Sequence, residues 1–535
     1  MKKNLQVLSI LLAVYFVVFG IRVFWFTQKN GFHVDEGMTI ALSNYKDYII
    51  SKNYEYEREY TGKQIKEESL TGKDSFKDVL SDIKSLWKDN RDSPHTNLYY
   101  TLLRISFIGI NSADIKPIVF RGAVLNLILF TISFIFFFLL IKRMFPNSVI
   151  MQYTAVLCAF LSSAGISNTL FLRPYQIQET MFIVLCFLFI KIIDLDNNIL
   201  DKNNRLVLIK QILLLALITG ITLLTGYYAV FFIGLLGSYV IYCKCREKHF
   251  ADILFYILVL ILGIGIACVI YPKYFGGFSS YRGTETIRTV SVNIFQNFKI
   301  SMLAAFVLLR THFFTLLTVL LCLLCSGYII YKKDKLIIQK HALFIFIAAM
   351  VYFIITIIIA PYKVLRYGMP VFPFFVILPM ILINTIYNKS KKIGAIAAVF
   401  LCLCLLPGAF NKNIIENHYN KKPEQYIFAK EPKTPVYIYM FYFKDLNYTA
   451  TWKYGNLVPY LNNNQKYYFI SDYNEIDSSP YNEFYIVAEN VPPLREFNNP
   501  MFEIIEEFEI STGEPETPSG LGNYFFGKKL KRIEN

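Results

Sequence analysis

Residues 118–141 read IVFRGAVLNLILFTISFIFFFLLI, and Arg121 is the one charged residue among them. A run of this kind is long enough to cross the ~30 Å hydrocarbon core of a bilayer as a single helix. Similar runs recur from the N-terminus to about residue 410. The mean hydropathy is +0.41 and only 17% of the residues are charged, whereas an ordinary soluble protein has about a quarter. The sequence therefore predicts a polytopic α-helical membrane protein.

We predict about eleven transmembrane helices from these runs. The first follows a basic start, has an apolar body of about twenty residues and is not followed by a small-residue cleavage site. It is therefore interpreted as an uncleaved span and not as a secretory signal. The predicted spans lie at roughly 5–26, 118–141, 149–166, 178–194, 206–225, 227–243, 251–271, 309–331, 341–360, 369–387 and 393–410.

Alternate connections between these spans are basic. They read MKK (1–3), KRMFPN (142–147), LDNNILDKNNR (195–205), CKCREKH (243–249), YKKDK (331–335) and NKSKK (388–392). Because cytoplasmic loops carry an excess of Lys and Arg, this pattern predicts a multi-pass protein of the cytoplasmic (inner) cell membrane with its N-terminus inside and its C-terminus outside. Three segments are then extracytoplasmic: a first loop at about 27–117, a second at about 272–308, and the tail after the last span.

Two domains are predicted. Residues 1–410 form the transmembrane domain, and its first loop (27–117) contains two interfacial helices, one in SFKDVLSDIKSLWKDN and one over 97–110. Residues 411–535 form a small extracytoplasmic domain. Short aromatic and β-branched runs at 435–440, 466–471, 483–489, 502–510 and 523–530 indicate strands, which suit α/β and mostly-β folds about equally; we favour α/β.

The net charge of the whole chain is +15, and the part before residue 412 carries +19, with 41 basic and 22 acidic residues. The tail from residue 412 has 13 basic and 17 acidic residues, so the excess of positive charge falls in the loops of the spans. No basic block interleaved with aromatic residues indicates nucleic-acid binding. Seven of the nine cysteines lie inside apolar runs, which indicates small buried side chains and not a disulfide framework.

Several cations lie at the predicted outer ends of spans, where Arg and Lys are uncommon and therefore indicate a specific role. They are Arg121, Arg173, Arg310, Lys363 and Arg366, together with Arg91 and His95 where the first loop returns to the membrane. One interpretation is that each side chain extends to the lipid headgroups. The other is that several converge on an anion at the membrane surface, because guanidinium groups pair with phosphate through two hydrogen bonds.

An acidic pair, Asp35 and Glu36, follows the first span in FTQKNGFHVDEGMTIALSNY (26–45). In one interpretation Asp35 is the N-cap of a helix that begins at GMTIALSNY. In the other the pair works with the outer-face cations as a base beside an anion clamp. His33 and His95 are weak candidates for metal ligands, because their spacing from the acidic pair is not that of a metal site.

The order of five short motifs resembles membrane glycosyltransferases of the GT-C superfamily, of the protein mannosyltransferase and aminoarabinose-transferase type. The motifs are HVDEG (33–37), PHTNLYYTLLR (94–104), IVFRGAV (118–124), RPYQIQ (173–178) and LRYGMPVFP (365–373). The resemblance covers about the first 410 residues. One departure concerns His95: relatives have His-Pro-Pro before Leu-Tyr-Tyr, whereas this chain has Pro-His-Thr-Asn, and this puts the role of His95 and the acceptor class in question.

The resemblance implies an inverting transfer of a sugar from a polyprenyl-phosphate carrier, for which we expect undecaprenyl phosphate, to an envelope acceptor on the outer face of the bilayer. It implies Asp35 as the general base and Glu36 as a neighbour that positions Asp35 or tunes its pKa. The donor phosphate and lipid head are assigned to Arg173, Tyr175, Arg366 and Tyr367, and after these to Arg91, His95, Arg121 and Arg310. The sequence requires no cofactor and leaves open a divalent metal.

Two alternatives are kept. A transporter or flippase of a lipid-linked sugar would also need cations near a lipid phosphate, but the chain shows no internal repeat, and repeats are frequent in transporters. A non-catalytic envelope scaffold would tolerate changes at Asp35 and at the arginines. The sugar, the acceptor class, the role of the tail and the oligomeric state do not follow from the sequence.

Overall fold

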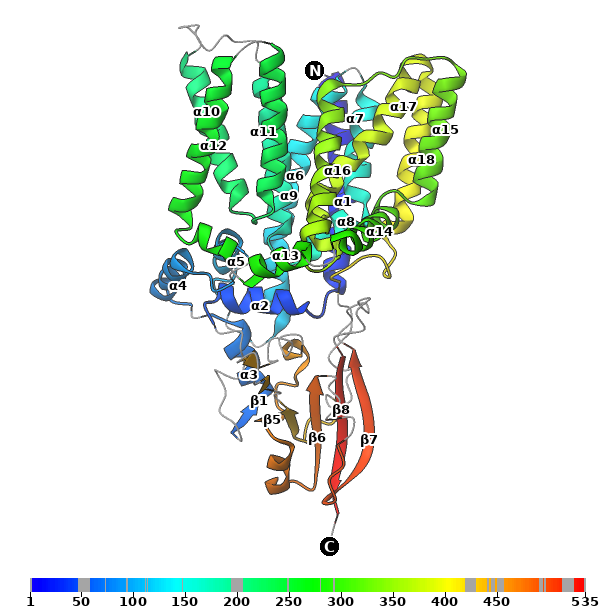
Figure 1. Cartoon of the computed structure of the whole chain (residues 1–535). Coiled ribbons are helices and arrows are strands. Elements are labelled where there is room, and N and C mark those ends of the chain that lie inside the picture. The colour runs from blue at the N-terminus through cyan, green and yellow to red at the C-terminus, as the bar shows by residue number, and fades with distance from the viewer. Residues whose placement is uncertain are drawn as a thin grey trace. The chain divides into compact units, whose positions relative to one another are not determined.

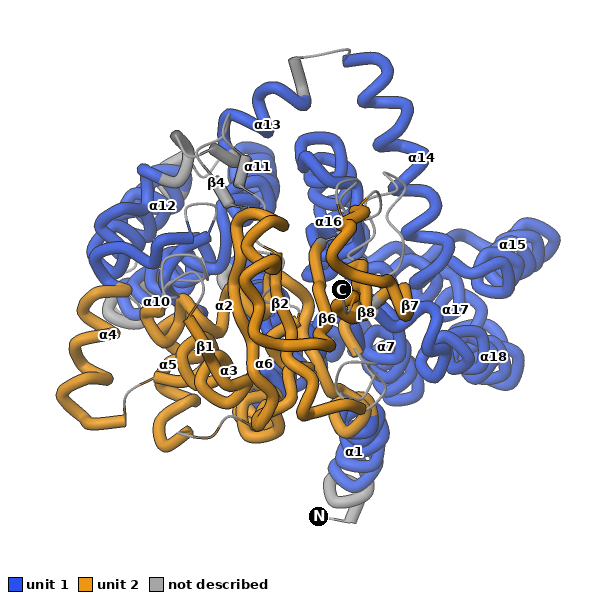
Figure 2. The backbone as a smooth tube through the Cα atoms, turned by 90° about the horizontal axis from the view of Figure 1, so that it is seen from below, with its two compact units in different colours: residues 1–24, 87–99, 125–416 blue, residues 25–86, 100–124, 417–535 orange. Residues whose placement is uncertain are grey.

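The computed structural model describes residues 2–46, 58–72, 74–92, 95–110, 112, 114–146, 148–193, 205–247, 250–279, 281–291, 294–418, 430–439, 442–443, 448–449, 457–489, 494, 497–511 and 524–533. The chain forms two compact units (Figure 2). Unit 1 consists of Met1–Phe24, Trp87–Tyr99 and Leu125–Glu416. Unit 2 consists of Trp25–Leu86, Tyr100–Val124 and Asn417–Asn535.

Unit 1 is helical. Four helices cross from one unit to the other: α1 (Lys2–Gln28), α4 (Phe76–Lys88), α5 (Leu98–Ser106) and α6 (Ile115–Met144). The helices within unit 1 are α7 (Val149–Leu161), α8 (Ser163–Leu170), α9 (Tyr175–Ile193), α10 (Arg205–Leu223), α11 (Ala229–Arg246), α12 (Phe250–Ile270), α13 (Tyr281–Ser291), α14 (Ile294–His312), α15 (Leu316–Tyr331), α16 (Lys340–Ile359), α17 (Ile377–Lys389) and α18 (Lys391–Ala409), with short 3-10 helices η2 (Tyr274–Ser279), η3 (Leu365–Tyr367) and η4 (Met369–Val376).

Eight helices of the described chain are long and apolar enough to cross a bilayer, or nine if the bent pair α7 and α8 is one span. This confirms the predicted polytopic helical fold. The count is below the eleven predicted, partly because two further spans correspond to shorter apolar helices, Ile209–Leu223 and Leu316–Tyr331. The chain is thus a multi-pass membrane protein.

Two predicted spans are not continuous helices. The span at 149–166 bends by 58° at Ser162, whose hydroxyl accepts a hydrogen bond from the Gly165 amide and caps α8. The span at 309–331 is broken after His312, and Thr315 caps α15 through the Thr318 amide. In both places a hydroxyl side chain satisfies the amides of a new helix start, which an apolar run does not reveal.

Helix α14 corrects the predicted second loop. We predicted residues 272–308 as a loop outside the membrane, but residues 294–312 form one apolar helix. Figure 1 shows α14 nearly along its axis while α15 and α16 appear lengthwise, and in Figure 2, turned by 90°, α14 appears from the side. The helix therefore lies across the direction of the neighbouring helices. It contacts α16 through Asn297, whose side chain donates to the Ile358 carbonyl.

The basic connections lie at one end of unit 1. The start of α1 and the α6–α7, α15–α16 and α17–α18 connections share this end in Figure 1. The common end is the arrangement that the positive-inside pattern requires. Which end faces the cytoplasm stays a prediction. Residues 195–204 and 248–249, which we predicted as further basic connections, lie outside the described residues.

Unit 2 contains a six-stranded sheet with the strand order β1-β5-β2-β6-β8-β7. Strand β2 pairs in parallel with β5 and with β6, while the other three pairings are antiparallel. The elements of unit 2 are α2 (Val34–Ser43), β1 (Glu59–Thr61), α3 (Gly62–Leu70), β2 (Val436–Tyr439), β3 (Tyr442–Phe443), β4 (Tyr448–Thr449), η8 (Val458–Tyr460), β5 (Lys466–Ile470), η9 (Tyr473–Ser478), β6 (Glu483–Glu489), β7 (Phe502–Ser511) and β8 (Tyr524–Arg532).

The sheet incorporates part of the first loop. Strand β1 pairs with β5 in the register Glu59↔Tyr468, and Lys466 and Tyr468 both donate hydrogen bonds to the Glu59 carboxylate at 2.9 and 2.7 Å. We predicted the first loop as part of a domain covering residues 1–410. The compact units instead group residues 25–86 and 100–124 with the tail. Three-residue β1 lies in a polar stretch without strand periodicity, so the sequence did not indicate this pairing.

Candidate functional site

The predicted site residues are divided between the two units. Asp35, Glu36 and Arg121 belong to unit 2, whereas the other predicted ligands (Arg91, His95, Arg173, Tyr175, Arg310, Arg366 and Tyr367) belong to unit 1. That the acidic pair and the cations act on one substrate stays a prediction.

The acidic pair lies in the first turn of α2, and its cap is one that we did not predict. His33 is the N-cap: its Nδ1 accepts a hydrogen bond from the Asp35 amide at 3.0 Å, and its own amide donates to Glu36 Oε2 at 2.7 Å. This reciprocal pair is a capping box. The interpretation of Asp35 as the N-cap is wrong. The Asp35 side chain is 20% exposed, and its Oδ2 lies 3.7 Å from Nδ1 of His33.

Glu36 has a structural partner. Its carboxylate is fully buried and forms an ion pair with the buried Lys29 ammonium at 2.8 and 3.0 Å. Lys29 also donates to the Asn417 carbonyl at 2.6 Å, which ties the start of α2 to the tail within unit 2. Burial lowers the pKa of Lys29, and the charge of Glu36 opposes that shift. Glu36 therefore stabilises the N-terminal end of α2, the helix that carries Asp35.

The His33 cap can be tested separately from any activity. We expect His33→Ala to weaken the start of α2 by about 1 kcal/mol, because the Asp35 amide loses its side-chain partner. Amide hydrogen exchange over residues 33–43 should then be about fivefold faster than in the wild type. His33→Asn, which supplies another N-cap acceptor, should restore slow exchange. Equal exchange in the Ala variant would contradict the role assigned to His33.

Unit 1 brings together Arg173, His95 and a carboxylate that sequence reasoning missed, Asp92. Arg173 Nη1 donates to Asp92 Oδ2 at 3.2 Å, and the same oxygen lies 3.2 Å from His95 Nδ1. Arg173 Nη2 lies within 3.3 Å of both His95 ring nitrogens. Arg173 and Asp92 are each 3% exposed. Asp92 thus holds Arg173 and His95 in one place, and its spacing from His95 in DNRDSPH was the signal available.

The segment that carries Asp92 is fixed to the ends of neighbouring helices. Asn97 donates to the Ile270 carbonyl at 3.0 Å, and Trp87 donates to the Val269 carbonyl at 3.0 Å. The hydroxyl of Thr96 donates to the Leu224 carbonyl. The returning part of the first loop is therefore held by α10 and α12. Arg91 has a positive φ of 59°, with its amide bonded to Asp89 Oδ1 at 3.0 Å, so the local turn is held by its own side chains.

Arg366, Tyr367 and Tyr175 form a second group within unit 1. The Tyr367 ring contacts Tyr175 edge to face at 6.5 Å and Tyr228 at 5.9 Å between centroids. The Arg366 guanidinium lies 5.4 Å from the Tyr367 ring centroid. Tyr175 in turn stacks on Phe171 at 5.7 Å. The four first-choice ligands therefore come from two segments, one with Arg173 and Tyr175 and the other with Arg366 and Tyr367. The contact between Tyr175 and Tyr367 brings these segments together.

Tyrosine hydroxyls surround the Asp92 cluster. Burial, together with the negative charges of Asp89 and Asp92, raises the pKa of Tyr271 to about 12, and its hydroxyl donates to Asn90 Oδ1 at 2.9 Å. Burial also raises the pKa of Tyr227, with Asp92 contributing. These phenols remain neutral near pH 7 and are hydrogen-bond donors beside the cations.

The remaining cations differ in surroundings. Lys363 donates to the Ile358 and Ala360 carbonyls at 2.9 and 2.8 Å, so it caps the C-terminus of α16. Burial lowers its pKa to about 8. Arg310 and Arg121 are exposed on α14 and α6, respectively. Their predicted role in holding the donor stays untested.

The metal prediction stays open. Within the residues that the structure describes, no three His, Cys, Asp or Glu side chains are grouped so that they could hold a metal ion. His33 and His95, the two histidines considered as ligands, belong to different units.

No protein-family model and no curated protein matches the sequence. The solved structures that resemble the backbone include ArnT from Cupriavidus metallidurans bound to undecaprenyl phosphate and the same protein in the apo state. The identity is 9% in both, and each comparison covers 99% of this chain and 98% of the other. The TM-scores are 0.47 and 0.44, and at such values the likeness supports no conclusion about this chain's activity.

Proposed function

We propose that this membrane protein transfers a sugar from a polyprenyl-phosphate carrier, with undecaprenyl phosphate as the expected lipid, to an acceptor on the outer face of the bilayer. The observation that carries the proposal is the grouping of Arg173, His95 and Asp92 beside the Tyr175, Tyr367 and Arg366 group. Cations fixed at the end of a helical bundle, with aromatic rings beside them, suit a phosphate attached to an apolar chain.

In the proposed reaction, an acceptor hydroxyl attacks the anomeric carbon, and the bond from that carbon to the phosphate oxygen breaks. The polyprenyl phosphate leaves with the bonding electrons, and its negative charge is stabilised by guanidinium groups. The hydroxyl proton goes to the Asp35 carboxylate, which is partly exposed. Attack from the face opposite the phosphate inverts the anomeric configuration.

Asp92 has a defined part in this proposal. Without a donor, its carboxylate neutralises Arg173 and keeps the guanidinium in one orientation. A phosphate would bind to the other hydrogen-bond donors of Arg173 and to His95. Because the pair is preorganised and buried, little side-chain entropy is lost when the donor binds.

One observation favours the transporter alternative. Arg22 and Glu179 are buried inside the helices of unit 1, and charges in spans often mark transport routes. Their hydrogen bonds, however, run to neighbouring polar side chains of α8 and α9. These contacts suit a fixed network better than a moving gate. The two activities differ in outcome, since a transferase changes the acceptor covalently.

Lipid binding by the purified full-length protein tests the assignment of Arg173. We expect Arg173→Gln to weaken binding of undecaprenyl phosphate at least about tenfold, because the planar cation is lost from the phosphate. Undecaprenol, which lacks the phosphate, should bind equally to wild type and variant. Arg143→Gln, a change of an exposed arginine at the basic end, is the matched control. Equal affinity of wild type and Arg173→Gln for the phosphate would remove Arg173 from the site.

A further inference from the structure

The helices of unit 1 enclose a pair of opposite charges for which the reaction above has no use. Arg22 of α1 is 0% exposed and Glu179 of α9 is 1% exposed. A buried charge is strongly unfavourable unless it is paired and hydrogen-bonded.

Three hydrogen bonds connect the two charges. Arg22 Nε donates to the Thr169 hydroxyl at 2.9 Å, and that hydroxyl donates to Gln176 Oε1 at 2.8 Å. Gln176 Nε2 then donates to Glu179 Oε1 at 3.0 Å. The chain starts on the Arg22 guanidinium and ends on the Glu179 carboxyl group, and hydrogen bonds to an ionised group are about twice as strong as neutral ones.

The same network holds both sides of one turn. Asn168 donates to the second Glu179 oxygen at 2.9 Å. Asn126 of α6 donates to the Thr169 and Phe171 carbonyls at 2.8 and 3.0 Å, which satisfies the end of α8. Thr169 and Gln176 thus flank residues 171–174, the connection between α8 and α9.

Arg22 is itself firmly placed. Its Nη1 donates to the Val18 and Phe160 carbonyls at 2.9 and 3.1 Å, and its guanidinium carbon lies 3.9 Å from the Phe130 ring centroid. These contacts come from α1, α6 and α7. The network therefore anchors the 171–174 turn to three helices besides the two that it joins.

We propose that Arg22 and Glu179 are positioning residues that fix the 171–174 turn and so set the orientation of Arg173 and Tyr175. This inference rests on the proposed function, in which these two side chains hold the donor phosphate and lipid head. Because hydrogen bonds that lead to Arg22 and Glu179 hold the turn from both sides, the guanidinium of Arg173 is already oriented for the phosphate. Residues behind the ligands of other binding sites orient those ligands in the same way.

The alternative is that the pair stabilises the fold and nothing more. The two roles separate in a double variant, because replacing both Arg22 and Glu179 leaves no uncompensated charge among the helices. Arg22→Met with Glu179→Gln should recover the melting temperature that each single variant loses. It cannot rebuild the hydrogen bond from Arg22 to Thr169, so the turn remains loosened.

The experiment measures the melting temperature and the undecaprenyl phosphate affinity of the purified full-length protein. We expect both single variants to melt lower than the wild type and to bind the lipid at least tenfold more weakly. The double variant should melt near the wild type and still bind at least tenfold more weakly. Wild-type affinity in the double variant would overturn the positioning role, even if the single variants do not fold.

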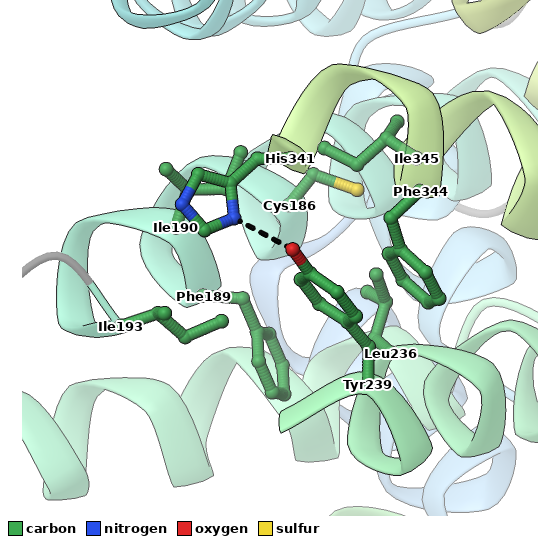
Figure 3. A pocket seen from close by; sticks show the side chains of 9 residues that line it. All are labelled: Cys186, Phe189, Ile190, Ile193, Leu236, Tyr239, His341, Phe344 and Ile345. Atoms are coloured by element: carbon green, nitrogen blue, oxygen red, sulfur yellow. Dashed lines mark hydrogen bonds between the residues drawn. The ribbon is translucent and has the colours of Figure 1, made fainter. Parts of the chain in front are cut away.

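A matched control comes from another polar pair of unit 1. The hydroxyl of Tyr239 in α11 forms a hydrogen bond of 3.1 Å with Nδ1 of His341 in α16, and the Tyr239 ring stacks on Phe344 at 3.8 Å between centroids. These residues line a small apolar pocket together with Cys186 (Figure 3). Tyr239→Phe removes this hydrogen bond without touching the 171–174 turn, so its lipid affinity should equal that of the wild type.

The outcomes also separate this inference from the proposed function. If the wild type binds undecaprenyl phosphate no better than undecaprenol, the donor site and the positioning role are both rejected. If the wild type discriminates and the double variant discriminates equally well, only the positioning role is rejected. A tenfold loss in the double variant with Tyr239→Phe unchanged supports both.

Discussion

Asp35→Asn is expected to slow sugar transfer by about 10³-fold, because the acceptor hydroxyl loses the carboxylate that takes its proton. The variant should keep the melting temperature of the wild type within a few degrees. The cap of α2 uses the His33 ring and the Glu36 carboxylate, and it needs only the amide of residue 35. Loss of one negative charge at the helix start lowers stability by less than about 1 kcal/mol.

Membranes from a deletion strain that contains either the wild-type chain or the variant provide the measurement. Mass spectrometry follows the conversion of the endogenous lipid-linked sugar with time. Asp334→Asn is the matched control, because Asp334 lies at the basic end of unit 1 and pairs with Lys389 at 3.3 Å. Asp35→Asn turning over at the wild-type rate would remove Asp35 as the base.

Glu36→Gln is expected to lower the free energy of unfolding by about 3 kcal/mol, since it leaves the Lys29 ammonium buried without its carboxylate. The effect is one of stability, because Glu36 is occupied by the ion pair and by the cap and carries no assigned proton transfer. Thermal unfolding of the purified protein measures it. The prediction separates Glu36 from Asp35, although the two are adjacent in the sequence.

A double variant provides the control for this pair. Lys29→Met together with Glu36→Gln removes both charges and should recover most of the lost stability. A Glu36→Gln variant that melts with the wild type would show that the buried ion pair contributes nothing to the fold. Slow transfer by a stable Glu36→Gln variant would instead assign the carboxylate to the reaction.

The membrane fold and the tail strands could be predicted because both depend on local patterns. Apolar runs located the spans, and five aromatic and β-branched runs located β2, β5, β6, β7 and β8 to within a residue or two. The bends could not be predicted in the same way. At Ser162 and Thr315 the apolar pattern of the sequence continues, but the hydroxyl of each residue caps the start of a new helix. The apolar composition of α14 likewise does not reveal that this helix lies across its neighbours.

The candidate site was predictable where residue type alone limits the chemistry. An arginine or a tyrosine at a span end is unusual enough to notice, and Arg173, Tyr175, Arg366 and Tyr367 came together in two groups of one unit. The carboxylate of Asp92 was missed, since an acid in a polar loop appears solvated until its partners are known.

Pairings that depend on distant parts of the chain were also missed. Lys29 gave no signal as the partner of Glu36, because a single lysine after a span is ordinary. The chain that joins Arg22 to Glu179 depends on three helices packing together, and Gln176 and Thr169 are unremarkable in the sequence. Such networks are set by tertiary packing, which local periodicity does not record.

The most direct test compares envelope glycans and lipid-linked sugars by mass spectrometry in three strains: a deletion, the deletion with the wild-type chain restored, and the deletion with Asp35→Asn. We predict that one sugar mass disappears from an envelope acceptor in the deletion, returns with the wild type and stays absent with Asp35→Asn, while the polyprenyl-phosphate-linked sugar accumulates. The lost mass would identify the sugar and the acceptor. An unchanged set of glycans in the deletion, or full restoration by Asp35→Asn, would contradict the assignment of this chain as a transferase that uses Asp35.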